Sequence, residues 1–392
     1  MSVWGKLASR YEGKENEPHK ILALDGGGIR GILTLEVLAR MEALLKKATG
    51  GGEAFRLCHF FDYIGGTSTG AIIAAGLARG MSARELLKFY QDTGPAMFDK
   101  QFILKRWHAL YKSEPLKKEL QEVFGANTTL KPNDLQCLLL AVTRNRTTDS
   151  PWPISSNPQA KYNDTARKDC NLKIPLWQIV RASTAAPVFF PPEVIHWDPK
   201  DRSKAFVFVD GGLTPYNNPA FLLYRMATES GYRLNWSDGE DKLLIVSIGT
   251  GAAAAVEDGI EDPNLGLIEN VALLPGALMY AAMVDQDTSC RLVGRCTHGA
   301  VLDREIGDMI PRDAADRKIP LNRNLGRKFL YARYNADLSR EGLAAMGLSD
   351  IEPKNVQKLD SVKYIKDLRR VGRKLAEEIR TEHFGSFAAA QG

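Results

Sequence analysis

A serine set between glycines constrains this chain more than any other feature. Residues 59–65 are mostly apolar, Gly66-Thr67-Ser68-Thr69-Gly70 follows, and an alanine-rich stretch occupies 71–78. This order predicts a buried strand that turns sharply into a helix, and GxSxG is typical of a nucleophile elbow, which exposes the serine hydroxyl. Amides at the start of the helix favour negative charge nearby. We therefore predict a nucleophilic Ser68 supported by Gly66 and Gly70, with an ordinary glycine-rich turn as the alternative.

A second glycine-rich segment follows the first predicted strand. Residues 20–24 form a continuous run typical of a strand buried on both faces. Asp25-Gly26-Gly27-Gly28-Ile29-Arg30-Gly31 then leads into a helix predicted from Ile32 to Ala48. Consecutive glycines at such a junction expose backbone amides. We expect the amides of Gly26, Gly27 and Gly28 to form an oxyanion hole. Arg30 either fixes this loop, meets a phosphate, or is a solvated residue at the start of the helix.

The same glycines raise a competing hypothesis from another functional class. Gly26, Gly28 and Gly31 match GxGxxG, the loop of dinucleotide-binding modules. That fingerprint also requires an acidic residue about 20 residues further on, at the end of a second strand. Here this distance falls within the predicted helix, around residues 44–47. The sequence therefore favours an oxyanion hole, and a nucleotide-binding module is kept as an alternative.

An aspartate ends another predicted strand. Residues 205–209 are apolar and run into Asp210-Gly211-Gly212. Open α/β sheets place functional groups at the carboxyl ends of strands, although Asp-Gly is also a common turn. Further strands are predicted over 137–144 and 242–248, and a helix over 176–186. We interpret the 25 residues after Arg144 as a loop because they are rich in Pro, Ser, Asn and Asp.

Composition limits the functional classes. The 392 residues carry a net charge of +5, which suits an anionic surface but is no nucleic-acid signature. Five scattered cysteines without a CxxC pair argue against a disulfide framework or a zinc site. The N-terminus lacks the apolar core of a signal peptide, and the apolar run 271–284 is too short to span a bilayer. We expect a cytoplasmic protein, at most peripheral to the inner face of the membrane, with no nucleic-acid partner.

The remaining segments are less distinctive. Residues 98–111 mix large apolar side chains with Lys and Arg, which predicts an amphipathic helix, or else a lid or membrane-facing surface. An apolar helix is expected over 267–284 and a strand pair around 327–334. A long final helix from Pro353 to Glu382 has one apolar stripe. Its other faces are basic, so they are either solvated or dock on anionic lipid.

Four of these pieces together resemble one known family, the patatin-like phospholipases. They are Asp25–Gly31, Gly66–Gly70, the segment Arg181–Pro192 (RASTAAPVFFPP), and Asp210-Gly211-Gly212 running to Asn217-Asn218-Pro219. Their order and spacing match the family over about residues 19–251. The resemblance implies a three-layer α/β/α patatin-like acyl hydrolase fold around a mostly parallel sheet. We accordingly expect a lead-in at 1–18, a hydrolase domain at 19–251, and a mainly helical extension at 252–392, packed on the same core.

The resemblance also implies the roles of individual residues. Ser68 is the expected nucleophile and Asp210 its base, forming a dyad in place of a triad. Gly26, Gly27 and Gly28 supply oxyanion amides with help from Arg30, while Gly211 and Gly212 support the aspartate. The one departure from the family pattern is Thr-Pro-Tyr between Leu213 and Asn217. A Ser-Asp-His triad that uses His298 is the competing interpretation.

The implied reaction is hydrolysis of fatty acyl esters of membrane phospholipids through an acyl-enzyme, without cofactor or metal. The partner is then a phospholipid, or another acyl-ester lipid, at a membrane surface. An alternative is an effector phospholipase of bacterial antiphage defence that a cyclic nucleotide activates. In that case Arg291, Arg295 and Arg304 are candidate phosphate ligands.

Overall fold

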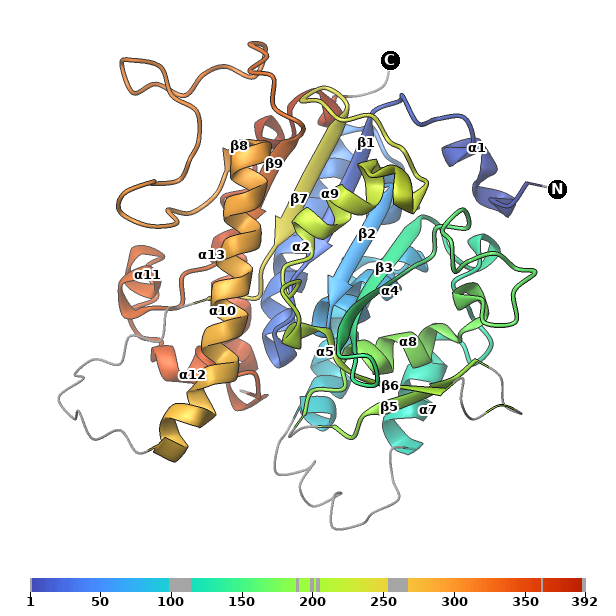
Figure 1. The fold of residues 1–392 in the computed structure, drawn as a ribbon. Coiled ribbons are helices and arrows are strands. Elements are labelled where there is room, and N and C mark those ends of the chain that lie inside the picture. The colour runs from blue at the N-terminus through green and yellow to red at the C-terminus, as the bar shows by residue number, and fades with distance from the viewer. Residues whose placement is uncertain are drawn as a thin grey trace.

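The computed structural model describes residues 2–98, 114–187, 190–197, 201, 205–252, 267–360 and 362–389. Within these ranges nine strands form one sheet in the order β5-β6-β3-β2-β1-β7-β9-β8, and β4 pairs with β3 (Figure 1). The strands are β1 His19–Leu24, β2 Tyr63–Thr67, β3 Leu138–Asn145, β4 Ser150–Ser155, β5 Glu193–His196, β6 Ala205–Asp210, β7 Leu243–Ile248, β8 Arg295–His298 and β9 Leu330–Tyr334.

The sheet is parallel through its centre and antiparallel at one side. Neighbours from β3 through β2, β1, β7 and β9 to β8 run parallel. The pairs β3–β4, β3–β6 and β5–β6 are antiparallel. This arrangement confirms the expected mostly parallel sheet. It also places the carboxyl ends of β1, β2 and β7 at one edge, where open α/β sheets carry their sites.

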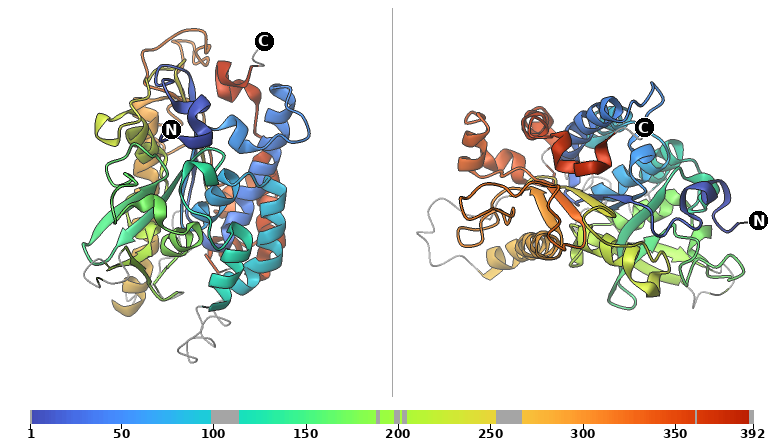
Figure 2. Two further views of the ribbon diagram at one scale, coloured as in Figure 1. Left: turned by 90° about the vertical axis from the view of Figure 1, so that its right-hand side faces the viewer. Right: turned by 90° about the horizontal axis from the view of Figure 1, so that it is seen from above.

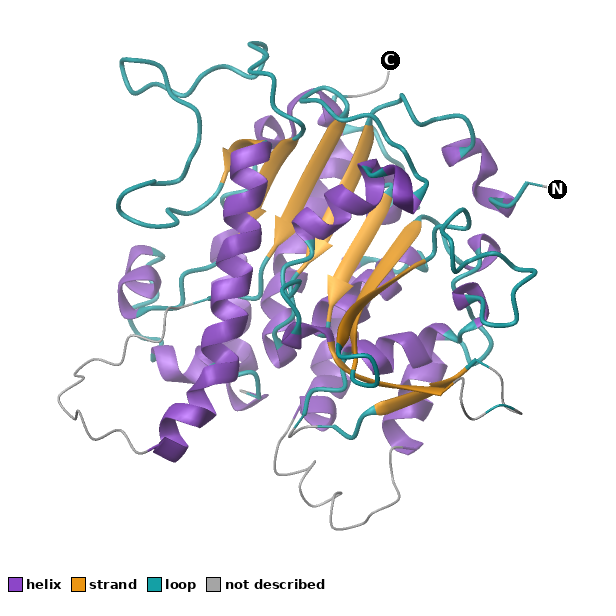
Figure 3. Ribbon diagram, viewed as in Figure 1, coloured by secondary structure: helices purple, strands orange, loops and turns teal. Residues whose placement is uncertain are grey.

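Helices cover both faces of the sheet (Figures 2 and 3). Successive strand residues point to opposite faces, so Leu22 and Leu24 of β1 pack with helices on one side, while Ile21 and Ala23 belong to a second core on the other. The three-layer α/β/α fold is thus confirmed. The helices are α1 Ala8–Tyr11, α2 Gly31–Ala48, α3 Leu57–Phe60, α4 Thr69–Ala78, α5 Ala83–Phe98, α7 Glu114–Phe124, α8 Leu176–Ser183, α9 Ala220–Thr228, α10 Leu267–Val293, α11 Arg340–Ala345, α12 Pro353–Gln357 and α13 Ile365–Ala376.

The strands predicted at 20–24, 137–144, 205–209 and 242–248 correspond to β1, β3, β6 and β7. One helix boundary has a clear chemical cause. The Glu85 amide donates to Ser82 Oγ at 3.1 Å, and the Ser82 amide donates to Glu85 Oε2 at 2.7 Å. This reciprocal capping box satisfies two amides that lack partners at a helix start, and α5 therefore begins directly after Ser82.

The N-terminal lead-in is more than a polar surface segment. Trp4, Leu7 and Tyr11 are buried in the core formed on the α9 face of the sheet. Arg10 donates to Asp62 Oδ1 through Nε at 3.0 Å and Nη2 at 2.9 Å. Three apolar side chains thus anchor this short polar segment to the core.

Two predictions for the middle and C-terminal parts need correction. The loop predicted after Arg144 contains β4, an edge strand that holds two prolines, Pro151 and Pro153. Edge strands tolerate proline because one side of the ladder is unpaired. The predicted strand pair near residue 330 is the single strand β9, which lies between β7 and β8. Residues 252–392 therefore contribute strands to the central sheet and are not only a helical layer packed on it.

The long helix predicted from Pro353 to Glu382 is interrupted. The first part, α12, ends at Gln357, and α13 begins at Ile365. Between them the Leu359 carbonyl accepts a hydrogen bond from the Ile29 amide at 3.0 Å. This tertiary bond uses a carbonyl that a continuous helix would need for its own ladder.

Some predictions fall on residues that the structure does not describe. The segment interpreted as an amphipathic helix or lid lies outside the described residues beyond Phe98, as do Val188 and Phe189 of the proline-rich motif. Among the described residues, no helix is both long enough and apolar enough to cross a bilayer.

Candidate active site

Ser68 occupies the predicted sharp turn between β2 and α4. Its backbone has φ 54° and ψ −121°, a conformation that is uncommon for a residue other than glycine. The flanking glycines are required by close backbone contacts. A Cβ on Gly66 would lie 2.1 Å from the Gly70 carbonyl oxygen, and one on Gly70 would lie 2.3 Å from the Leu24 carbonyl oxygen. The elbow geometry predicted from GxSxG is therefore present, with Ser68 half-buried.

The structure brings Ser68 and Asp210 into contact. Ser68 Oγ donates to Asp210 Oδ2 at 2.6 Å, across a separation of 142 residues in sequence. The strand β3 explains the meeting, because Val142 pairs with Thr67 of β2 on one side and Thr143 pairs with Asp210 of β6 on the other. The β3 strand thus sets the end of β6 beside the end of β2.

The environment of Asp210 changes its acidity. Asp210 is buried, and burial raises its pKa to about 6, although hydrogen bonds from Ser68 and from the Gly212 amide oppose the shift. The Gly212 amide donates to Asp210 Oδ1 at 2.7 Å. One carboxylate oxygen is therefore fixed by the backbone while the other faces the serine. A carboxyl with this pKa is ionised at neutral pH and is a stronger base than a solvated aspartate.

No described histidine forms a hydrogen bond with Ser68 or Asp210. His298 instead pairs with Glu378, with 3.2 Å between Nε2 and Oε2, and its ring stacks on His383 at 4.4 Å. The alternative of a Ser-Asp-His triad that uses His298 is therefore wrong.

The loop Gly26–Gly28 lies against the serine, since a Cβ on Gly26 would be 3.2 Å from Ser68 Cβ. The Gly26 amide, however, donates to the Asn217 carbonyl at 3.1 Å. It is therefore not available to an oxyanion, so the expected role of Gly26 is wrong, whereas the roles of Gly27 and Gly28 stay predictions. In the described structure, no acceptor is found for the amides of Gly27 and Gly28. Gly28 has φ 59°, which favours glycine.

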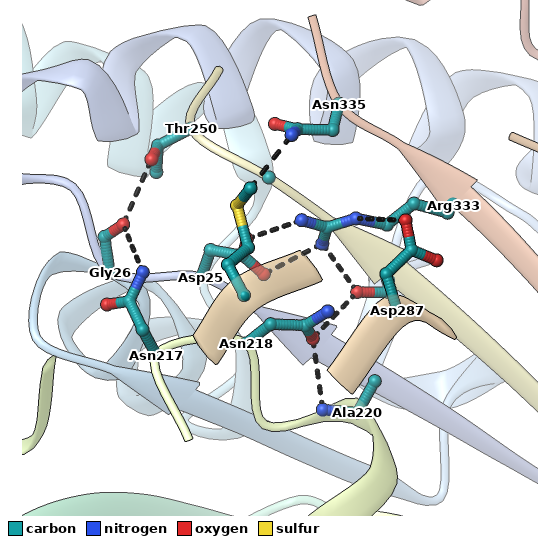
Figure 4. A network of polar contacts seen from close by, with 12 residues as sticks. Asp25, Gly26, Asn217, Asn218, Ala220, Thr250, Asp287, Arg333 and Asn335 are labelled. Carbon is teal, nitrogen blue, oxygen red and sulfur yellow. Dashed lines mark hydrogen bonds and ion pairs between the residues drawn. The ribbon is translucent and has the colours of Figure 1, made fainter. Parts of the chain in front are cut away.

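The segment that departs from the family pattern and Asn217, which follows it, contact both parts of the site. The carbonyl of Tyr216 accepts a hydrogen bond from Thr67 Oγ1 at 2.6 Å, and the next carbonyl, that of Asn217, accepts the Gly26 amide. Thr250 Oγ1 donates to the Gly26 carbonyl at 2.9 Å (Figure 4). These contacts position the glycine loop relative to the elbow.

Asp25, which begins the glycine loop, is fixed by a residue that the sequence did not reveal. Arg333 of β9 donates to both carboxylate oxygens, at 2.8 Å and 2.6 Å (Figure 4). It also donates to Ser247 Oγ at 2.7 Å. Both members of the pair are buried. Burial works to lower the pKa of Arg333, but the Asp25 carboxylate outweighs it and holds the pKa above its ordinary value. A buried aspartate requires a cation, yet nothing in the sequence pointed to one 308 residues away.

We expect Arg333→Met to lower the free energy of unfolding by about 3–5 kcal/mol, because it leaves the Asp25 carboxylate buried without a cation. Urea unfolding monitored by circular dichroism measures the change. Adding Asp25→Asn to Arg333→Met removes the uncompensated charge and should restore much of the loss. The matched control is Arg370→Met, which breaks an exposed pair with Asp350 and should change stability little. Equal effects of Arg333→Met and Arg370→Met would contradict this role.

Arg30 lies half-buried beside the loop, so the hypothesis of a fully solvated residue is wrong. Burial lowers its pKa to about 10, which leaves it protonated at neutral pH. Its Nε atom has no hydrogen-bond partner among the described residues.

Ser183, in the segment Arg181–Pro192, supports the elbow from α8. It accepts a hydrogen bond from the Ser68 amide at 3.0 Å and donates to the Val142 carbonyl at 2.6 Å.

Two further hypotheses can be judged from the structure. Residues 44–47 lie inside α2, and the next strand begins only at Tyr63, so the dinucleotide fingerprint is not met. Arg291 and Arg295 are buried and hold the chain internally, through Asp287 at 2.8 Å and Glu240 at 2.9 Å respectively. They are therefore not available as phosphate ligands. Arg304 is exposed, and its role in binding phosphate stays a prediction.

Comparisons with known proteins identify the family of the chain. The family model for patatin-like phospholipases matches residues 22–224. The chain is 34% identical over 223 residues to a cGAMP-activated phospholipase of Vibrio cholerae, covering 54% of this chain and 58% of that protein. It is 31% identical over 257 residues to an intracellular phospholipase A2 of Caenorhabditis elegans, covering 64% of this chain and 21% of that protein. It is 28% identical over 246 residues to Patatin-2-Kuras 1 of Solanum tuberosum, covering 59% of this chain and 62% of that protein.

The matches to the bacterial cGAMP-activated relatives span only a little more than half of those proteins. The family model, in contrast, covers the elbow, the glycine loop and Asp210, which are the segments that build the site. The chain belongs to the patatin-like phospholipase family.

Proposed function

We propose that this protein is a lipid acyl hydrolase of the phospholipase A type, which cleaves fatty acyl esters of membrane phospholipids with Ser68 as nucleophile and Asp210 as base. The single observation that supports this most strongly is the 2.6 Å hydrogen bond between the two side chains at a strained turn. A nucleophile within hydrogen-bond reach of its base is the signature of covalent catalysis. Family membership supplies the substrate class.

The reaction follows from the positions of these groups. Ser68 Oγ attacks the acyl carbonyl carbon while its proton passes to Asp210 Oδ2. The resulting oxyanion accepts hydrogen bonds from the amides of Gly27 and Gly28. As the carbon–oxygen ester bond breaks, Asp210 returns the proton to the leaving lysolipid. Water then attacks the acyl-serine, again losing a proton to Asp210, and the fatty acid is released as Ser68 is regenerated.

The pKa of Asp210 predicts the pH dependence. The carboxylate must be ionised to accept the serine proton, so kcat/KM should rise with pH through about 6, the pKa of Asp210, and level off above it. Initial rates on a soluble ester between pH 4 and 9 measure this profile. A rate that falls as the pH rises from 5 to 7 would contradict the role of Asp210 as base.

The proposed function is tested by lipid mass spectrometry on mixed phospholipid liposomes, comparing the wild-type protein with Ser68→Ala. We expect lysolipid and free fatty acid only with the wild type. EDTA should leave the activity intact, since the proposed mechanism uses no cation. Wild-type protein that releases no fatty acid under any condition would contradict the proposal.

A second candidate is a phospholipase that a cyclic nucleotide activates. Two relatives bear the name cGAMP-activated phospholipase, at 34% and 33% identity. The same liposome assay with and without a cyclic dinucleotide separates the two candidates. Acyl release that is equal with and without nucleotide favours the ungated enzyme, and release that depends on nucleotide favours the gated one.

A further inference from the structure

The α10 helix presents an apolar turn to solvent beside the candidate site. Gly276, Ala277, Leu278, Tyr280 and Ala281 are exposed, and the Leu278 side chain is 68% exposed. Between them Met279 is half-buried, with its Cε 3.2 Å from the position a Cβ on Gly212 would take. The exposed turn therefore adjoins the residue whose amide holds Asp210. The turn lies near the middle of α10, and Figure 1 shows this helix passing the edge of the sheet where β1, β2 and β7 end.

A group of lysines lies on the other side of the same site. The Leu359 carbonyl binds the amide of Ile29, directly after the glycine loop, at 3.0 Å. Four lysines around this contact are exposed and form no ion pair with a described residue. They are Lys354, Lys358, Lys363 and Lys366. Figure 1 places α12 at the same edge of the sheet as the N-terminal end of α10.

Basic residues further along the same segment are arranged differently. Arg369 pairs with Glu36 at 2.5 Å, and Arg370 pairs with Asp350 at 2.7 Å. Lys374 pairs with Glu377 at 3.3 Å. Of the two interpretations of the basic C-terminal segment, docking on anionic lipid therefore suits only its first part. Beyond Lys366 most of the charge is neutralised within the chain, whereas the four lysines up to Lys366 remain available to an external anion.

We propose that the exposed turn 276–281 and the lysines at 354, 358, 363 and 366 form one docking surface for an anionic phospholipid bilayer. This inference rests on the proposed function, since a lipid must reach Ser68 from the membrane. The turn inserts its apolar side chains among the acyl chains, and the lysines contact the anionic head groups. The turn contacts the site on the side of Gly212, and the segment that carries the lysines contacts it on the side of the glycine loop.

Flotation of vesicles with the full chain carrying Ser68→Ala tests the surface without hydrolysis. Vesicles of mixed phosphatidylglycerol and phosphatidylcholine are compared with vesicles of phosphatidylcholine alone. Lys358→Glu with Lys366→Glu should weaken binding to the anionic vesicles by at least about 25-fold, at about fivefold per lysine, and should change binding to phosphatidylcholine little. Leu278→Asp should weaken binding to both kinds of vesicle by about tenfold.

Each change has a matched control. Leu292 is 55% exposed on the same helix, about four turns further from the site, so Leu292→Asp should not affect binding. Lys131 and Lys168 are exposed without ion partners among the described residues, and Lys131 precedes β3 at the opposite edge of the sheet. Lys131→Glu with Lys168→Glu therefore controls for net charge. Vesicle binding that falls equally in test and control variants, or in neither, would overturn the proposal.

A second measurement keeps this proposal separate from the proposed function. In protein that retains Ser68, the test variants should hydrolyse a soluble short-chain ester at the wild-type rate while losing activity on vesicles. Loss of activity on both substrates would mean that the substitutions damage the site, and would count against docking. If the wild type hydrolyses no ester but the binding differences appear as expected, the function fails and the docking surface stands.

Discussion

Ser68→Ala is expected to reduce acyl release from phospholipid vesicles by at least about 10⁴-fold, because removal of the nucleophile eliminates the acyl-enzyme route. The backbone at position 68 already adopts a positive φ, and alanine keeps the same Cβ, so the fold should survive. Asp210 retains the hydrogen bond from the Gly212 amide. Lipid mass spectrometry of vesicles incubated with equal amounts of the two proteins measures the loss.

The structural control for Ser68→Ala is its thermal unfolding, which should stay close to that of the wild type. Vesicle binding should also persist, since the hydroxyl is not part of the docking surface. If a correctly folded Ser68→Ala protein still released fatty acid at a tenth of the wild-type rate or more, Ser68 would not be the nucleophile.

Asp210→Asn is expected to reduce kcat by about 10⁴-fold, the size of effect measured when an acidic member of a serine hydrolase site becomes an amide. The asparagine oxygen can still accept the Gly212 amide. Its other group is then an NH₂ that faces Ser68 and cannot take a proton. Steady-state kinetics on a soluble ester measure the loss, and the residual rate should no longer rise through pH 6.

The control for Asp210→Asn is its free energy of unfolding. The direction in which this free energy changes with pH follows from the shifted pKa of Asp210. The pKa of Asp210 is raised by burial to about 6, so the folded protein binds this proton more tightly than the unfolded chain does. The aspartate therefore costs stability as the pH rises from about 4 to above 6, where it must ionise in a buried site. Asparagine avoids this cost, so the variant should be at least as stable as the wild type at pH 8. An Asp210→Asn protein with normal turnover would contradict the dyad.

Local patterns in the sequence predicted the parts of the site that lie on single turns. The Gly66–Gly70 segment specified the elbow because only glycine allows the backbone contacts that its turn requires, and the apolar runs specified β1, β3, β6 and β7. The resemblance to the family then joined Ser68 to Asp210. The same reasoning assigned three amides to the oxyanion hole and missed that the Gly26 amide is bound to Asn217.

The sequence by itself determined the elbow, the glycine loop and the strand that carries Asp210, because these depend on steric limits and apolar periodicity within a few residues. Only the tertiary structure decided that Arg333 neutralises Asp25, that His298 lies with Glu378, and that Leu359 interrupts a helix to hold the glycine loop. Ion pairs and hydrogen bonds of this kind depend on the order of strands in the sheet. The strand order brings together residues that are far apart in the sequence, and it cannot be predicted from any local pattern in the chain.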